Sequence, residues 1–154
     1  RLNTDTQQMA YVLRRGETEP PPGLQQAFRR GNRMQDLLTT ALAEGRTGNE
    51  ILHDALEAAR AEDIEAMVYS HPIGYHGHGA GPAIGMWDKQ DGVPGAGELP
   101  VRDRTAYSIE LSITELVAEW GGRSVRIMLE EDAVLEGGRV RYLDGRQTEL
   151  RLVR

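Results

Sequence analysis

Two long strand patterns in the C-terminal half of the chain constrain its fold more than any other feature. Between residues 106 and 113, apolar side chains occupy every second position, which predicts a strand with one apolar and one polar face. A second long strand is predicted over residues 124–135. Shorter strands are predicted at residues 1–14, 64–69, 139–143 and 148–153. The segment Asp144–Gln147, between the last two, is typical of a hairpin turn.

Two helical patterns separate the first predicted strands. Apolar residues at helical spacing predict a helix over residues 23–44, directly after the stiff connector Pro20–Pro22. Thr47 and Glu50 then form a capping box, which predicts the start of a second helix. A Gly- and His-rich segment, residues 71–97, is expected to be a loop. Strand, two helices and then mainly strands is an order that favours an α+β fold.

Charge and composition exclude several classes of function. The 154 residues carry a net charge of −6 and contain no Lys/Arg-rich run, so we expect no nucleic-acid partner. No apolar stretch is long enough for a membrane span, and the lack of cysteine excludes disulfides, zinc–thiolate sites and cysteine nucleophiles. The sequence opens on Arg1 with neither a start methionine nor a signal peptide, so we expect a piece of a longer or processed protein and assign no compartment.

Three of the four histidines lie in one Gly-rich segment, at positions 71, 76 and 78. Glycines let the backbone approach a ligand closely, and imidazole is the commonest metal ligand in proteins. The segment is therefore a candidate metal or acid–base site, and a flexible loop with exposed histidines is the alternative. It is not a phosphate loop, because no Gly-Lys-Ser/Thr follows the glycines. The fourth histidine, His53, is expected on the surface of the second helix.

Two glutamates on the long strands are candidate ligands. Glu110 lies on the polar face of its strand, where it points either into a concave site or to solvent. Glu131 shares the apolar face of its strand, where a carboxylate is costly to bury unless it is paired, protonated or bound to a metal. A strand bulge that turns Glu131 outward is the alternative. Its neighbour Glu130 falls on the opposite face, together with Arg126 and Met128.

Asp5 lies among polar residues of the first predicted strand and is unremarkable by itself. Together with the histidines and the two glutamates, however, it makes an oxygen-rich set of donors without cysteine. Such a set favours Mn²⁺, Fe²⁺, Co²⁺ or Zn²⁺ in a carboxylate-bridged pair. A pair of this kind activates a water molecule and stabilises a tetrahedral intermediate.

Several of these motifs resemble those of the pita-bread metallopeptidases, the family of methionine aminopeptidase, prolidase and Xaa-Pro aminopeptidase. The segment His71–Gly74 is similar to the family's metal-binding His-Gly-Ile-Gly, and His78 stands where its second histidine stands, seven residues later. The segment Thr4–Thr6 resembles that of the second Asp ligand, Ser108–Glu110 takes the place of Glu-Pro-Gly, and Glu131–Leu135 resembles the final Glu-Asp strand. The similarity runs along the whole chain, and the C-terminal DGRQTELRL is similar to the tail of Xaa-Pro aminopeptidases.

The resemblance implies the C-terminal part of a pita-bread (creatinase/aminopeptidase) fold, with a curved antiparallel sheet and flanking helices. Residues 1–154 would form the C-terminal portion of one metallopeptidase catalytic domain, with the first Asp ligand upstream of Arg1. The implied reaction is removal of the N-terminal residue from Xaa-Pro peptides with two divalent ions, drawn from Mn, Co, Zn and Fe. The implied partners are the peptide substrate and, along an open edge, the upstream part of the same protein or a second copy. Alone, the segment is expected to be inactive.

The resemblance also assigns roles. It implies metal binding by four residues, Asp5, His71, Glu110 and Glu131. It implies catalysis by His78, Glu110 and Glu131, and substrate binding by His76 and His78. Two rival hypotheses share the fold. A creatinase-like hydrolase lacks the metal carboxylates, and a domain kept only as a binding module, as in some histone chaperones, lacks the histidine and glutamates of the site. Retention of these residues favours the peptidase.

Overall fold

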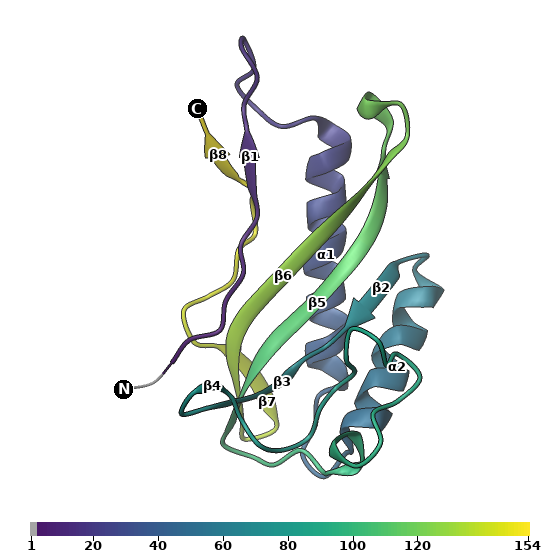
Figure 1. Ribbon diagram of the computed structural model, residues 1–154, viewed down its shortest axis with the longest axis vertical. Coiled ribbons are helices and arrows are strands. Elements are labelled where there is room, and N and C mark those ends of the chain that lie inside the picture. The colour runs from purple at the N-terminus through teal and green to yellow at the C-terminus, as the bar shows by residue number, and fades with distance from the viewer. Residues whose placement is uncertain (1–2) are drawn as a thin grey trace.

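The computed structural model describes residues 3–154, and a long antiparallel pair of strands forms its centre (Figure 1). This pair consists of β5 (Thr105–Val117) and β6 (Arg123–Glu136), which are joined through the short helix η2 (Ala118–Trp120). Its register runs without interruption along the full length of β5. Four shorter strands extend the pair into a six-stranded antiparallel sheet: β2 (Glu65–Val68), β3 (His71–Gly74), β4 (Gly77–His78) and β7 (Arg139–Tyr142).

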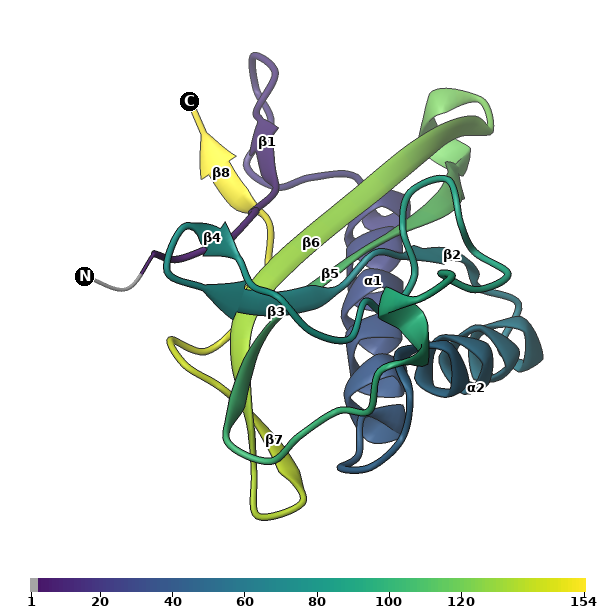
Figure 2. The same ribbon diagram turned by 60° about the horizontal axis from the view of Figure 1, so that its bottom comes forward.

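Two helices lie against one face of this sheet (Figures 1 and 2). The first, α1 (Pro22–Ala41), begins at a proline, which suits the first turn of a helix, and it ends earlier than the predicted position 44. The second, α2 (Gly48–Ala61), begins with the predicted capping box between Thr47 and Glu50, which is therefore confirmed. No helix of the described residues has the length and apolar character that a membrane crossing requires.

The core lies between these helices and the apolar face of β5 and β6. The predicted apolar positions of β5 are all buried: Tyr107, Ile109, Leu111 and Ile113. At Gly31 of α1 a Cβ atom would lie 2.9 Å from Ile127 Cγ2, so the backbone of this helix packs directly on β6. The two-faced character predicted for β5 is thus confirmed, and its other face stays available for polar side chains.

The first and last segments form a separate two-stranded sheet. β1 (Ala10–Val12) pairs in parallel with β8 (Arg151–Val153), and Gln7 bridges to Glu130 of β6. The strand predicted over residues 1–14 is therefore much shorter, and its first two positions lie outside the described residues. Before β1, Gln7 pairs with Glu130 only as an isolated bridge, so no continuous strand forms there.

The predicted hairpin between residues 139–143 and 148–153 is wrong. β7 follows a turn at Gly137 and Gly138 and pairs with β6 instead. Both glycines have the positive φ values, 58° and 75°, that tight hairpin turns favour. The segment Asp144–Gln147 carries the chain from β7 towards β8, which pairs with β1.

The segment expected to be a loop, residues 71–97, contains a small hairpin. β3 pairs with β5, His71 opposite Ser108, and β4 folds back onto β3. Frequent glycines weaken the apolar alternation that identifies a strand, so the sequence pattern does not reveal this hairpin. A short helix, η1 (Ala96–Glu98), ends the segment.

Candidate metal centre

The β3–β4 hairpin brings two of the predicted histidines together. His78 is paired with Ile73, so its side chain lies on the same face as that of His71, at a diagonal position. The centroids of the two imidazole rings lie 4.0 Å apart. The close approach of the strands depends on glycine, because a Cβ at Gly74 would lie 2.7 Å from Gly79 Cα. The seven-residue spacing of the histidines is thus the length of one tight hairpin.

The two central strands add a pair of carboxylates next to these rings. Glu110 of β5 and Glu130 of β6 are direct cross-strand partners and extend from the same face of the sheet. His71 Nε2 lies 3.7 Å from Glu110 Oε2, and Ser108 Oγ donates to Glu130 Oε1 at 2.8 Å. Ligand atoms of His71, Glu110 and Glu130 all lie within 4.8 Å of one another. This geometry is compact enough for a shared cation.

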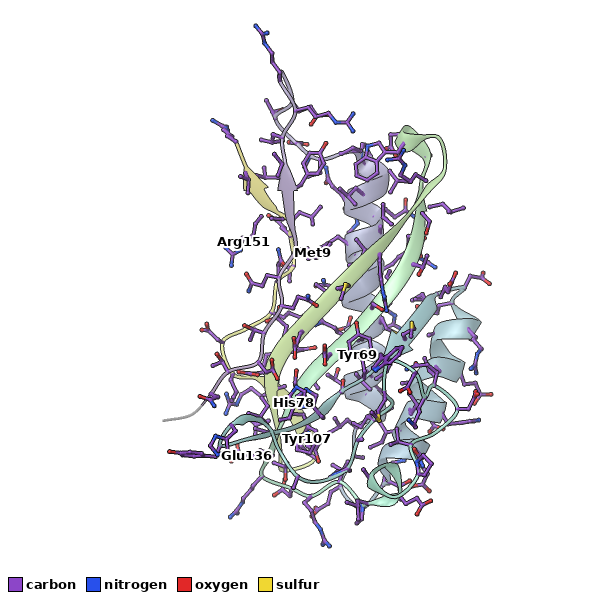
Figure 3. The ribbon with its side chains drawn as sticks, viewed as in Figure 1. Met9, Tyr69, His78, Tyr107, Glu136 and Arg151 are labelled. Atoms are coloured by element: carbon purple, nitrogen blue, oxygen red, sulfur yellow. The ribbon has the colours of Figure 1, made fainter. Side chains whose placement is uncertain are left out.

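Asp5 completes the cluster from the N-terminal segment. Its Oδ2 lies 3.7 Å from His71 Nε2 and 3.4 Å from His78 Nε2. Its backbone N–H donates to Asp132 Oδ1 at 3.2 Å, which holds this segment against β6. Figure 3 marks the cluster by His78. Three of the four predicted metal ligands therefore converge, together with the histidine predicted to contact substrate.

The surroundings of His71 fit a bound cation. Its Nδ1 lies 3.1 Å from Pro72 O and donates to it, which leaves Nε2 with a free lone pair. This Nε2 is buried, has no hydrogen-bond partner among the described residues, and faces carboxylate oxygens of Asp5 and Glu110. A lone pair beside two carboxylates is repelled unless a cation or a proton lies between them. Imidazole and carboxylate donors suit Mn²⁺, Fe²⁺, Co²⁺ and Zn²⁺, so these residues fit divalent ions.

The electrostatics of the cluster support the same interpretation. Burial, together with the charges of Glu130 and Asp5, raises the pKa of the Glu110 carboxyl to about 7. Burial also raises the pKa of Glu130 and that of Asp132. Burial lowers the pKa of His71, so its imidazole is neutral at neutral pH and ready to act as a ligand. A divalent cation bound beside the neutral imidazole would stabilise the ionised form of these carboxylates.

The structure separates the two adjacent glutamates of β6. Glu131, predicted as a metal ligand and catalytic residue, lies on the opposite face from Glu110, because it is paired with Ile109 in an uninterrupted register. Its predicted place on the apolar face is confirmed, since the residue is only 4% exposed. Its Oε1 accepts a hydrogen bond from Gln147 N at 2.8 Å and does not join the cluster. Glu130 takes the position expected for Glu131.

Two histidines lie outside the cluster. His76, predicted to bind substrate, is exposed at the turn between β3 and β4, where its ring packs edge-on against Tyr75 at 4.8 Å between centroids. It does not belong to the wall of the cleft beside the cluster. His53 is on α2 with 71% of its side chain exposed, which confirms the surface position predicted for it.

A cleft of about 990 Å³ opens beside the cluster, and His71, His78 and Glu110 form part of its wall. Much of the remaining wall comes from the segment after β4 and is apolar. Its most prominent member is Trp87, which is 72% exposed although it is a large aromatic residue. An exposed tryptophan next to polar groups is typical of a ligand-binding surface.

A single glutamine holds the segment that carries Trp87. Gln90 Oε1 accepts a hydrogen bond from Val68 N at 2.9 Å, and its Nε2 donates to Val68 O at 2.8 Å and to Met86 O at 2.6 Å. The side-chain amide thus pairs with the end of β2 and fixes the neighbouring Trp87 at the cleft. Sequence reasoning missed this wall, because an isolated tryptophan in a Gly-rich segment has no periodic signal.

Comparison with known proteins identifies the fold. No family model matches the chain, and no curated relative matches it. Several solved structures, however, are similar to it. An X-Pro aminopeptidase from Thermotoga maritima is 20% identical with a TM-score of 0.63, and the match covers 88% of this chain and 35% of that one. A dipeptidase from Pyrococcus horikoshii is 21% identical with a TM-score of 0.64, and the match covers 97% and 37%.

A protein of another kind has the same fold. The N-terminal domain of the FACT complex subunit SPT16 from Eremothecium gossypii is 11% identical with a TM-score of 0.72, and the match covers 97% of this chain and 33% of that one. The chain therefore spans about a third of the length of the structures it matches. Together they show that it has the pita-bread fold, which confirms the predicted α+β class with a mainly antiparallel sheet and flanking helices.

Proposed function

We propose that the protein to which this chain belongs is a dinuclear metal-dependent aminopeptidase, which hydrolyses the N-terminal bond of Xaa-Pro peptides. The observation that carries this proposal is the unpartnered Nε2 of His71, which faces oxygens of Asp5 and Glu110 at 3.7 Å each. Glu130 lies beside them as the fourth donor. The fold shared with an X-Pro aminopeptidase and a dipeptidase supports the reaction class.

The residues of the cluster then have separate roles. Asp5, His71, Glu110 and Glu130 would hold two divalent ions, Mn²⁺, Co²⁺, Zn²⁺ or Fe²⁺, together with the upstream ligand. When bound, such ions supply Lewis acidity and an activated water. Either Glu110 or Glu130 accepts a proton and passes it to the leaving amine. His78, with 78% of its side chain exposed, donates a hydrogen bond to the oxygen of the scissile carbonyl.

The cleft receives the peptide in this proposal. Its volume of about 990 Å³ lies at the upper end of the usual range for ligand sites, which leaves room for more than two residues. Trp87 and the neighbouring Met86 offer apolar contact to a proline ring or another apolar side chain. Binding here places the scissile bond next to His78 and Glu110, because these residues share the same wall.

The extent of the catalytic domain is part of the proposal. Residues 1–154 correspond to its C-terminal portion, as the order of the motifs implies; the match covers 35% of the X-Pro aminopeptidase, which supports a portion of a longer domain. The remaining metal ligand and partner strand come from the upstream part of the same protein or from a second copy. Residues 1–154 alone are therefore inactive.

A binding module without catalysis is the second candidate function. The observation in its favour is the TM-score of 0.72 with the N-terminal domain of SPT16. Against it stands the convergence of Asp5, Glu110 and Glu130 around His71, which a binding surface does not need. The same carboxylates also argue against a creatinase-like hydrolase.

Metal analysis of the purified full-length protein separates these candidates. The peptidase should contain roughly two divalent ions per chain and should hydrolyse an Xaa-Pro peptide when Mn²⁺ or Co²⁺ is supplied. A protein that takes up no ion and cleaves no peptide is a binding module. Hydrolysis of a small amidine substrate without metal would identify the creatinase-like alternative.

A further inference from the structure

The side chain of Gln147 binds the backbone of Met9 as a neighbouring strand would. Met9 N–H donates to Gln147 Oε1 at 2.7 Å, and Gln147 Nε2 donates to Met9 O at 2.7 Å. A further bond from Nε2 to Glu149 O, also 2.7 Å, fixes the orientation of the amide. Gln147 is 6% exposed, so these bonds are shielded from water. Figure 3 shows Met9 beside Arg151, whose backbone N–H donates to Met9 O at 3.2 Å.

The side chain of Glu131, on β6, binds the backbone of this glutamine. Its Oε1 accepts from Gln147 N at 2.8 Å in a buried contact. The two adjacent glutamates of β6 therefore act on opposite sides of the sheet. Glu130 extends towards the metal cluster, whereas Glu131 extends to the helix-covered face and binds the C-terminal segment.

Met9 lies at the end of a short series of contacts that leads to Asp5. Gln7 exchanges two backbone hydrogen bonds with Glu130, at 2.9 and 3.2 Å. Every second residue of this segment directs its backbone N–H and C=O to the same side, so Met9 follows Gln7. The backbone of Met9 bonds to the side chain of Gln147 and not to a residue of β6. The N-terminal segment is thus held at Gln7 and Met9 as well as at Asp5 itself, and the orientation of the Asp5 side chain depends on all three points.

We infer that Gln147 and Glu131 are positioning residues, which hold the N-terminal segment so that the Asp5 carboxylate reaches the metal site. The inference rests on the proposed function, because it takes Asp5 as a ligand. Loss of the Gln147 amide removes both bonds to Met9 and leaves its N–H without that acceptor. Met9 O then keeps the bond from Arg151 N–H, and Asp5 keeps the bond from its own N–H to Asp132. The segment after Asp5 is held less firmly, and the Asp5 carboxylate samples positions away from His71.

The test is a Co²⁺ titration of the full-length protein, followed by the visible absorption of the bound ion. Gln147→Leu should weaken Co²⁺ binding by about 10-fold, the lower end of the range for a lost outer-shell partner, because Gln147 acts on Asp5 only through the backbone, and it should change the spectrum. Glu131→Gln keeps an oxygen acceptor for Gln147 N and should bind like wild type, whereas Glu131→Leu should weaken binding. Gln8→Leu is the matched control, because Gln8 Oε1 accepts from Arg151 at 3.0 and 3.2 Å and takes no part in the contacts to Met9.

Each outcome decides the inference. Wild-type affinity in Gln147→Leu overturns it, and so does lost binding in Glu131→Gln, which would make Glu131 a ligand. If circular dichroism shows that Gln147→Leu does not fold, three other variants test the inference. These are the two Glu131 variants and Gln147→Glu, which keeps the acceptor for Met9 N–H but loses the donor to Met9 O. If the wild type binds no Co²⁺, the proposed function fails separately. Hydrogen exchange then tests the contact, since Gln147→Leu should expose the Met9 amide and leave that of Ile109 protected.

Discussion

Glu110 and Glu130 are direct partners across β5 and β6, and both extend from the face of the sheet opposite the helices. Side chains paired in this way have Cβ atoms about 5 Å apart, where two carboxylates destabilise each other unless a charge of opposite sign lies between them. His71 Nε2 lies 3.7 Å from Glu110 Oε2, and it presents a lone pair. The glutamate pair is therefore the part of the cluster that gains most from a cation.

The first prediction follows from this pairing. Glu130→Gln should lower the metal content of the full-length protein, because it replaces a charged donor in the cluster with a neutral amide. The affinity should fall by at least the roughly 10–100-fold that loss of an outer-shell partner costs. Elemental analysis after dialysis measures the effect. Glu136→Gln, at the exposed end of the same strand, is the control and should keep the wild-type content. Undiminished metal in Glu130→Gln would remove this residue from the site.

The sequence alone places Glu130 on the opposite face from Glu131. Only the pairing of β5 with β6 shows that Glu130 lies directly opposite Glu110. Alternation places Glu110 on the polar face and Glu131 on the apolar face, and the structure confirms both positions. Residues on opposite faces of an uninterrupted pair cannot meet, so the motif likeness that made Glu131 a ligand conflicts with alternation. The turn after β5 sets Val117 opposite Arg123, and this register leads directly to Glu110 opposite Glu130.

Local signals identified the two helices and the two long strands, whereas the β3–β4 hairpin and the long-range contacts were hidden. The capping box at Thr47 is a short-range interaction, and for that reason the sequence reveals it. The amide of Gln147 reaches Met9, far away in the sequence, and no periodic pattern encodes such a contact. The same holds for Gln90, which places Trp87 at the cleft.

The second prediction separates the two histidines of the hairpin. His78→Ala should keep the metal content of the wild type and reduce kcat by roughly 10²–10³, the usual cost of losing one donor to a developing oxyanion. Steady-state kinetics with an Xaa-Pro peptide, together with elemental analysis, gives both quantities. His76→Ala is the matched control, because His76 is exposed at the turn of the same hairpin. Loss of metal from His78→Ala would instead make His78 a ligand, as its 3.4 Å distance to Asp5 Oδ2 allows.

The third prediction concerns the wall of the cleft. Trp87→Ala should lower kcat/KM for peptides with a bulky apolar side chain by about 10–200-fold, the range that one methylene is worth in a hydrophobic pocket. A glycine-containing analogue should be affected much less, and Trp87→Phe should restore most of the activity. Leu116→Ala removes a side chain that is 68% exposed elsewhere on the sheet and should change nothing. An equal loss for all peptides would show that Trp87 supports the fold and does not select the substrate.

The last prediction concerns the pH dependence of stability in the metal-free protein. The pKa of Glu110 is about 7 in the folded chain against 4.5 for an exposed carboxyl, so the folded state binds more protons between these values. The stability that Glu110 contributes is therefore fully present below pH 4.5 and is lost as the pH rises through about 7. Glu130, whose pKa is also raised by burial, acts in the same direction. His71 acts in the opposite direction, since burial lowers its pKa below 6.5 and protonation favours the unfolded chain.

Comparison with Glu110→Gln isolates the carboxylate. In the presence of a chelator, the difference in Tm between wild type and Glu110→Gln should shift in favour of the wild type as the pH falls from about 8 to about 5. With Mn²⁺ in place of the chelator, the trend should reverse, because metal binding requires ionised carboxylates and a neutral imidazole and releases protons. Glu136→Gln should follow the wild type under both conditions. A difference in Tm that stays constant with pH in the chelated protein would mean that Glu110 is not buried among carboxylates, and the cation site would lose its main support.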